Sequence, residues 1–147
     1  MRSRYPTLPA AYLIFRRKDG KVLLMRRQNT GYKDGWYGLP SGHVEEGEPA
    51  LIAAIREAKE EVGVDVEAQD LRMVHVMHRL SESRDHERVD FGFEVAKWKG
   101  TPYNAEPDKC SELRWADPDD LPEHTIDVVA LMFEHAKHGR VYSHHNF

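Results

Sequence analysis

Apolar residues alternate with polar ones, or run together briefly, in several short segments of the chain. These segments predict strands, and they lie at residues 8–17, 21–27, 36–39, 71–80, 88–98 and 112–116. In two longer segments, at 50–62 and 125–138, apolar residues recur every three or four positions and a glycine follows. Such spacing with a terminal glycine is typical of helices. We therefore expect an α/β fold in which helices cover a mixed sheet.

The first turn and the two ends of the chain complete this expectation. Residues 18–20 (Lys-Asp-Gly) predict a hairpin turn between the first two strands. Residues 1–6 and 141–147 show neither period, so we expect loose tails there. At 147 residues the chain has the length of one domain, and we expect a single domain over residues 1–147.

The helix predicted at 50–62 separates its side chains by face. Pro49 precedes it and Gly63 follows it, as suits the two ends of a helix. At about 100° per residue, the larger apolar side chains share one side, which we expect to be buried. They are Leu51, Ile52, Ile55, Ala58 and Val62. On the opposite side lie three acids, Glu57, Glu60 and Glu61, among three small residues, Ala50, Ala53 and Ala54, that leave room for a ligand.

The three acids predict a metal site. Like charges three or four positions apart repel by a few tenths of a kcal/mol per pair, and Arg56 offsets this chiefly at Glu60. A divalent cation would remove the repulsion, and clustered carboxylates without a thiol suit Mg²⁺, with Mn²⁺ as a substitute. Mg²⁺ also binds substrate phosphates, so the helix indicates phosphate chemistry. The alternative is a solvated acidic face, but the preceding glycine-rich loop, residues 38–48, favours a ligand site.

Composition limits the partners of the chain. A formal charge of −4 offers no broad attraction for nucleic acid or for an anionic membrane. The single cysteine, Cys110, forms no internal disulfide and suits a small buried position in a cytoplasmic protein. No apolar run approaches the roughly 20 residues of a membrane span. We expect a cytoplasmic protein that binds neither nucleic acid nor a membrane.

Residues 42–64 fit the pattern G-x5-E-x7-R-E-U-x-E-E-x-G-U, in which U is apolar. The matching residues are Gly42, Glu48, Arg56, Glu57, Ala58, Glu60, Glu61, Gly63 and Val64. This pattern resembles the signature of the Nudix hydrolases, which cleave nucleoside diphosphates linked to another group. The resemblance implies an α/β/α sandwich, a small-molecule nucleotide substrate and Mg²⁺, and it allows a homodimer. It extends from the first predicted hairpin to the last predicted helix.

The resemblance also implies roles for residues in and around the pattern. Glu57, Glu60 and Glu61 would be catalytic metal ligands, and the Gly42 carbonyl could add a further ligand. Arg27, fifteen residues before Gly42, matches an arginine that touches substrate phosphate in MutT-type relatives. Glu106 follows a Trp-x-Gly-x-Pro stretch at residues 98–102, where several relatives place a further carboxylate. That carboxylate would be a fourth metal ligand or the base that accepts a proton from water.

Other residues carry weaker expectations. Glu48 and Arg56 would pair and hold the loop against the helix. His43 follows Gly42 and could touch phosphate, and Trp36 could stack on a base, although packing in the core is the alternative. Ser41 stands where many relatives have glycine, so a positive φ there would cost about 1 kcal/mol.

The remaining histidines predict no zinc site. His75 and His78 lie three positions apart on a predicted strand, so they face opposite sides. No set of cysteine and histidine residues has the spacing of a zinc site. Phe91 and Phe93 share one strand face, and we expect them in the core.

The function that we expect is Mg²⁺-dependent hydrolysis of a nucleoside triphosphate to the monophosphate and pyrophosphate. Two alternatives remain open. One is cleavage of ADP-ribose or another nucleoside diphosphate derivative. Relatives with that activity often carry a proline about fifteen residues after the signature, and no proline occurs here between Pro49 and Pro102. The other alternative is an inactive nucleotide sensor, but such domains usually lose some of the acids that this chain keeps.

Overall fold

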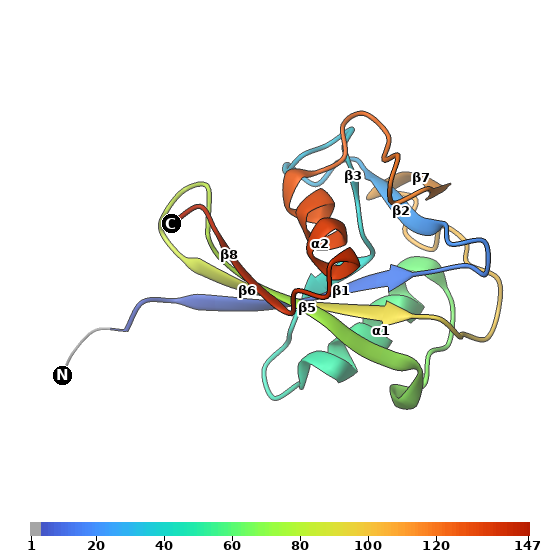
Figure 1. Ribbon diagram of the computed structural model, residues 1–147, viewed down its shortest axis with the longest axis horizontal. Coiled ribbons are helices and arrows are strands. Elements are labelled where there is room, and N and C mark those ends of the chain that lie inside the picture. Colours follow the sequence, from blue (N-terminus) through green and yellow to red (C-terminus); the bar gives the residue numbers. More distant parts are fainter. Residues whose placement is uncertain (1–3) are drawn as a thin grey trace.

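The computed structural model describes residues 4–147, and Met1–Ser3 lie outside the described residues. The strands are β1 (Thr7–Phe15), β2 (Val22–Arg27), β3 (Tyr37–Gly38), β4 (Ser41–His43), β5 (Leu71–Leu80), β6 (Glu87–Val95), β7 (Cys110–Ala116) and β8 (Tyr142–His145). The helices are α1 (Ala50–Val62) and α2 (Asp127–Lys137), with a 3₁₀ turn η1 (Ala68–Asp70) before β5. Figure 1 shows the two helices on opposite sides of the central strands.

Within the described residues the strands form two sheets. The larger has the order β4-β1-β6-β5-β8, and the smaller has the order β3-β2-β7. In the larger sheet β1 runs parallel to β6 and β8 runs parallel to β5, whereas β4–β1 and β5–β6 are antiparallel. The central sheet is therefore mixed, as the pattern of strands and helices predicts.

Each helix closes a separate hydrophobic core, and the two cores lie on opposite faces of the strands. One core joins α1 to one face of β1 through residues such as Ala54, Val62 and Leu13. The other joins α2 to the opposite face of the strands through residues such as Phe133 and Ile14. Because successive strand residues point to opposite faces, Leu13 and Ile14 enter different cores. The fold is the expected α/β/α sandwich.

The first predicted hairpin differs in its pairing. The turn forms at residues 18–20, where Gly20 N donates to Arg17 O at 2.9 Å and Arg17 N donates to Lys21 O at 2.9 Å. Beyond the single bridge between Arg16 and Val22, however, β1 and β2 separate into different sheets. β1 is buried on both faces between β4 and β6, so β2 pairs instead with β3 and β7.

The buried face predicted for α1 is right for Ala58 and Val62, but it is wrong for Ile52 and it misses Ala53 and Ala54. Ala53, Ala54 and Ala58 are completely buried, whereas Ile52 is 47% exposed. The alanines contact the core because their short side chains allow the helix to lie close to β1 and β4, and larger residues would hold it away. In this orientation Glu57 of α1 lies directly against Gly42 of β4.

The C-terminal segment is not a loose tail. Its residues 142–145 form β8, which pairs in parallel with Val76–Arg79 of β5. The pairing is supported by His75, which is fully buried and contacts Arg140 O at 2.6 Å and Ser143 Oγ at 2.7 Å. At the other end of the chain, Tyr5 Oη donates to Arg84 O at 2.7 Å and Glu87 N donates to Pro6 O at 2.9 Å.

Candidate active site

Gly63 fixes the C-terminal end of α1, close to Glu60 and Glu61. Gly63 adopts a left-handed conformation with φ of 70°, and its N–H donates to Lys59 O at 3.1 Å. A β-carbon at this position would also collide with the ring of Tyr103. Glycine therefore ends the helix without strain and lets the 103–106 loop approach it.

Glu48 and Arg56 clamp the loop onto the helix, as the signature implies. Arg56 Nε donates to Glu48 Oε2 at 2.8 Å, and Arg56 Nη2 donates to Glu48 Oε1 at 2.9 Å. Arg56 Nη2 also donates to the carbonyl of His43 at 3.1 Å. This two-pronged ion pair lowers the pKa of Glu48 to about 2. Through these contacts Arg56 connects the middle of the 38–48 loop, at His43, and its end, at Glu48, to α1.

Arg56 also lies between two of the acids. Its Nη1 is 2.7 Å from Glu57 Oε1 and 3.2 Å from Glu60 Oε2. The nearer acid is therefore Glu57, whereas the helical spacing alone predicts Glu60. The guanidinium neutralises one edge of the acidic group and leaves Glu61 without an ion-pair partner among the residues that the structure describes.

Gly42 is required by the position of Glu57. A β-carbon on Gly42 would overlap the carboxylate and Cγ of Glu57. The side chain of Glu57 is only 10% exposed, so it has little room to move aside. The glycine of the signature thus allows β4 and α1 to approach until the carboxylate reaches the strand.

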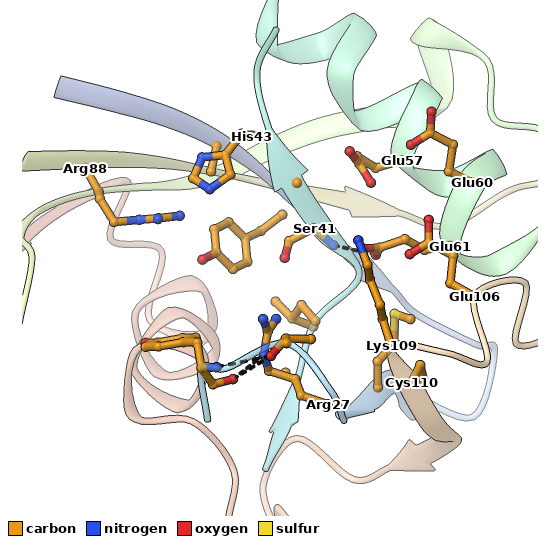
Figure 2. A pocket seen from close by; sticks show the side chains of 18 of the residues that line it. Arg27, Ser41, His43, Glu57, Glu60, Glu61, Arg88, Glu106, Lys109 and Cys110 are labelled. Atoms are coloured by element: carbon orange, nitrogen blue, oxygen red, sulfur yellow. Dashed lines mark hydrogen bonds between the residues drawn. The ribbon is translucent and has the colours of Figure 1, made fainter. Parts of the chain in front are cut away.

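Glu61 is held by the neighbouring residue of the same strand. Ser41 N donates to Glu61 Oε2 at 2.8 Å. Ser41 lies in β4 outside the left-handed region of backbone angles, so serine carries no strain where many relatives have glycine. Figure 2 shows Ser41 between Glu61 on one side and His43 on the other.

The 103–106 loop brings Glu106 to the same acids. Tyr103 N donates to Val62 O and Ala105 N donates to Glu61 O, each at 3.1 Å. Asn104 fixes the loop from inside, because its Oδ1 accepts from Glu106 N at 3.2 Å and its Nδ2 donates to Cys110 O at 2.7 Å. In the described part of the chain, the Glu106 carboxylate has neither a hydrogen bond nor an ion pair.

Burial and mutual repulsion perturb the acids. Burial raises the pKa of Glu57, Arg56 opposes that rise, and the charges of Glu60 and Glu106 add to it. Burial raises the pKa of Glu61 well above its ordinary value, and the charges of Glu57 and Glu106 raise it further. Glu57, Glu61 and Glu106 therefore interact electrostatically as one group.

A cavity of about 1010 Å³ connects these acids with most of the other predicted residues. Its lining includes Gly42, Arg27, His43, Glu60 and the three coupled acids. Arg27 Nε donates to Tyr32 O at 2.8 Å, and its guanidinium lies over the Tyr32 ring at 5.4 Å. Burial, followed by the charge of Arg88, lowers the pKa of His43.

Trp36 is the predicted site residue that the structure does not bring to this cavity. It is absent from the lining, its indole lies edge-on to His124 at 4.9 Å, and it packs against the core beneath α2. The loop of residues 28–35 is held by Arg27 and Gly35 so that Trp36 turns toward α2. The core alternative therefore holds for Trp36.

The sequence did not identify the residues that line the cavity at the end away from these acids. Tyr12, Arg79 and Arg88 line it there, on β1, β5 and β6. Arg79 and Arg88 are direct cross-strand partners, and Asp90 lies two residues after Arg88, on the same face of β6. Charged residues inside otherwise apolar strands were the available signal, but only the pairing of the strands shows that they meet.

Glu57, Glu60, Glu61 and Glu106 form the acidic end of the cavity, and these residues fit a hard divalent cation. Carboxylate oxygens are the ligands that Mg²⁺ prefers, and partly buried acids that repel one another are stabilised by such an ion. Among residues 4–147, no three side chains converge closely enough to complete a metal site alone. Mg²⁺ usually retains several waters and shares its coordination with substrate phosphate, so an incomplete protein shell suits it.

The other predicted assignments concern packing. His75 is buried against the C-terminal segment, and His78 contacts Glu87 at 2.5 Å. Cys110 is buried, and Phe91 and Phe93 both belong to the core beneath α1. None of the helices described over residues 4–147 is long and apolar enough to cross a membrane.

Comparison with known proteins places this geometry in a family. A family model of the NUDIX domain matches residues 6–135. The structure resembles a MutT NUDIX hydrolase from Burkholderia pseudomallei with a TM-score of 0.78 and 26% identity, over 87% of this chain and 96% of that one. It also resembles a MutT protein from Bacillus halodurans with a TM-score of 0.72 and 23% identity, over 95% and 90% of the two chains.

Curated relatives differ in the substrate that their names give. An 8-oxo-dGTP diphosphatase of Escherichia coli is 26% identical over 128 residues, which are 85% of this chain and 95% of that enzyme. An ADP-ribose pyrophosphatase of Methanocaldococcus jannaschii is 43% identical over 58 residues, but these cover only 40% of this chain and 34% of that protein. These names do not agree on one substrate, whereas the domain match covers most of the chain. The chain therefore belongs to the Nudix hydrolase family.

Proposed function

We propose that this protein is a Mg²⁺-dependent hydrolase that converts a nucleoside triphosphate to the monophosphate and pyrophosphate. The observation that carries the proposal is the electrostatic coupling of Glu57, Glu61 and Glu106 at the end of a cavity that Arg27 also lines. Partly buried acids that repel one another are typical of a site where a cation binds between them and an anionic substrate.

Each side chain has a separate role in the proposed mechanism. Glu57, Glu60 and Glu61 would hold the ion, with the Gly42 carbonyl as a further ligand. When bound, Mg²⁺ neutralises the polyphosphate and lowers the pKa of water. Arg27 binds phosphate oxygens from the part of the cavity that it lines, and His43 contacts phosphate beside Gly42. Glu106 accepts the proton of the attacking water, because its carboxylate has no other hydrogen bond in the described chain.

Glu48 and Arg56 do not contact the substrate in this mechanism but position the metal-binding acids. Their ion pair holds the loop on α1, and Arg56 fixes one oxygen of Glu57 at 2.7 Å. The remaining carboxylate surface of Glu57 and Glu61 then faces the cavity. Positioning of this kind lowers a reaction barrier because the ligands need not reorganise when substrate binds.

The comparisons favour a triphosphate among the three hypotheses. The 8-oxo-dGTP diphosphatase is matched over nearly its whole length, whereas the ADP-ribose pyrophosphatase is matched over about a third of its length. An inactive sensor is disfavoured because every acid of the signature is present and the coupled acids face the cavity. A homodimer remains a prediction that a sedimentation measurement would test.

A substrate panel tests the proposal. Purified protein is incubated with Mg²⁺ and with nucleoside triphosphates, ADP-ribose and a 5′-triphosphorylated RNA, because one matched relative is named RNA pyrophosphohydrolase. The proposal expects pyrophosphate and a nucleoside monophosphate from a triphosphate. Release of AMP and ribose phosphate from ADP-ribose alone would support the second hypothesis. Tight nucleotide binding without any product would support the sensor.

A further inference from the structure

The cavity has a basic end opposite the acids. This basic end consists of Tyr12, Arg79 and Arg88, with Asp90 buried beneath them. Figure 2 shows Arg88 and His43 on one side of the cavity and Glu57, Glu60, Glu61 and Glu106 on the other, with Ser41 between. The two ends are therefore parts of one binding space.

The guanidinium group of Arg79 makes hydrogen bonds to other residues of the protein. Its Nε donates to Asp90 Oδ2 at 2.6 Å, and its Nη2 donates to Tyr12 Oη at 3.4 Å. The side chain of Arg79 is 8% exposed and that of Asp90 is 1% exposed. This buried pair is a fixed part of the cavity wall.

Arg88 is different, because no acceptor on the described chain satisfies it. Its Nε is buried without a hydrogen-bond partner and lies 3.6 Å from Asp90 Oδ1, too far for a good hydrogen bond. Its side chain is only 18% exposed, yet it lines the cavity. A largely buried guanidinium without acceptors is costly unless a ligand supplies them.

The charges at this end do not balance. Asp90 offers one negative charge to two arginines that face each other across β5 and β6. Two other acids of the lining, Glu45 and Glu82, have side chains 68% exposed and pair with Arg56 and Lys33 respectively. One positive charge therefore remains at Arg88.

We propose that Arg88 binds a second anionic group of the substrate, a phosphate or a carboxylate remote from the bond that is cleaved. The planar fork of a guanidinium matches such oxyanions with two parallel hydrogen bonds. This inference rests on the proposed function, since it names the class of nucleotide that the same cavity takes. The preferred substrate is then a nucleotide that carries negative charge at both ends.

The first test measures anion binding without turnover. Inorganic phosphate, and acetate in a parallel arm, are titrated into Mg²⁺-free protein while the Nε–H signals of the arginines are followed by NMR. We expect the Arg88 signal to shift with saturation by at least one anion, and Arg88→Gln to weaken that binding at least tenfold. The arm that saturates at lower concentration distinguishes phosphate from carboxylate. No shift in either arm, or equal binding by the variant, would overturn the proposal.

The second test uses the best substrate of the panel. Arg88→Gln should raise KM at least tenfold with kcat within about twofold, because Arg88 binds the remote group equally in the ground and transition states. Arg88→Lys, which keeps the charge but loses the fork, should fall between. The matched control Arg72→Gln removes an arginine that is 76% exposed and pairs with Glu94 outside the cavity, and its KM should not change.

Misfolding of a variant can be distinguished from a loss of anion binding in these tests. Arg88→Gln leaves the Arg79–Asp90 pair intact, and a thermal melt checks that the variant is folded. If the protein hydrolyses no nucleotide, the proposed function fails, whereas the phosphate and acetate titrations still decide the role of Arg88. An unchanged KM in a folded Arg88→Gln protein would overturn the inference even if hydrolysis is confirmed.

Discussion

The two ends of the cavity handle charge in opposite ways. At the acidic end, burial and the charges of neighbouring acids raise the pKa of Glu57 and of Glu61, and Arg56 pairs with Glu57 and Glu60 as well as with Glu48. At the basic end, Asp90 is buried beneath two arginines and neutralises one of them. In the described chain, the acidic end thus has two acids without an ion pair, Glu61 and Glu106, and the basic end has an arginine, Arg88, whose buried Nε has no hydrogen-bond acceptor. A metal ion and an extended anion together would satisfy both.

The largest effect should come from removing the buried charge of the basic end. Asp90→Asn leaves Arg79 without its ion-pair partner in a position that is almost fully buried. Breaking a buried pair in this way costs about 3–5 kcal/mol of unfolding free energy. Urea unfolding measures it. The matched control is Asp119→Asn, which removes an acid that is 62% exposed and pairs with Lys137. A loss as small as that of the control would contradict the buried pairing.

At the acidic end the same kind of change should affect chemistry more than stability. Glu61→Gln keeps the shape of the side chain and removes charge from the coupled acids. We expect turnover of the best substrate to fall at least a hundredfold, or about 2.7 kcal/mol, with little change in the melting temperature. Glu60→Gln should do likewise. Turnover near that of the wild type in a folded Glu61→Gln protein would defeat the mechanism.

Gly42→Ala tests the approach of the strand to the helix. The added methyl group would overlap the Glu57 carboxylate, so the acid or the strand must shift. We expect a loss of about 1–3 kcal/mol in stability, as for other overpacked sites, together with lower turnover. Ser41→Ala in the same strand is the control, because its backbone N–H still reaches Glu61. Equal stability and activity of the two variants would show that Gly42 is not needed for this approach.

The smallest predicted effect is a pH dependence at the loop clamp. The pKa of Glu48 is lowered to about 2 by Arg56, so the pair stabilises the fold fully above the ordinary glutamate pKa. This stabilisation is lost as the pH falls from about 4.5 through 2. The difference in stability between wild type and Glu48→Gln should therefore shrink over that range in urea unfolding. A difference that stays constant with pH would mean that the ion pair contributes nothing.

The acidic end was predictable from sequence because its residues are neighbours on one helix and one loop. Glu57, Glu60 and Glu61 are brought together by the helical period, and Gly63 marks where the helix ends. Glu106 and Arg27 lie far from this segment, and only the family resemblance pointed to them. The expected central sheet and two covering helices also formed.

The errors have a common physical cause, which is that tertiary packing overrides local pattern. Ile52 is exposed and Ala54 buried because close approach to the sheet matters more than side-chain size on α1. Residues 142–145 form a strand because the edge of β5 offers a partner, although their own sequence shows no alternation. Arg88 meets Arg79 only through the pairing of β5 with β6, which no local period reports.

The most direct test of the account is whether the coupled acids bind a divalent cation. Mn²⁺, which relaxes water protons when bound, is titrated into wild-type protein, Glu57→Gln, Glu61→Gln and the control Asp119→Asn. We predict saturable binding by the wild type and the control, and at least tenfold weaker binding by each of the other two variants. Equal Mn²⁺ affinity in all four proteins would contradict the claim that these acids form the metal site.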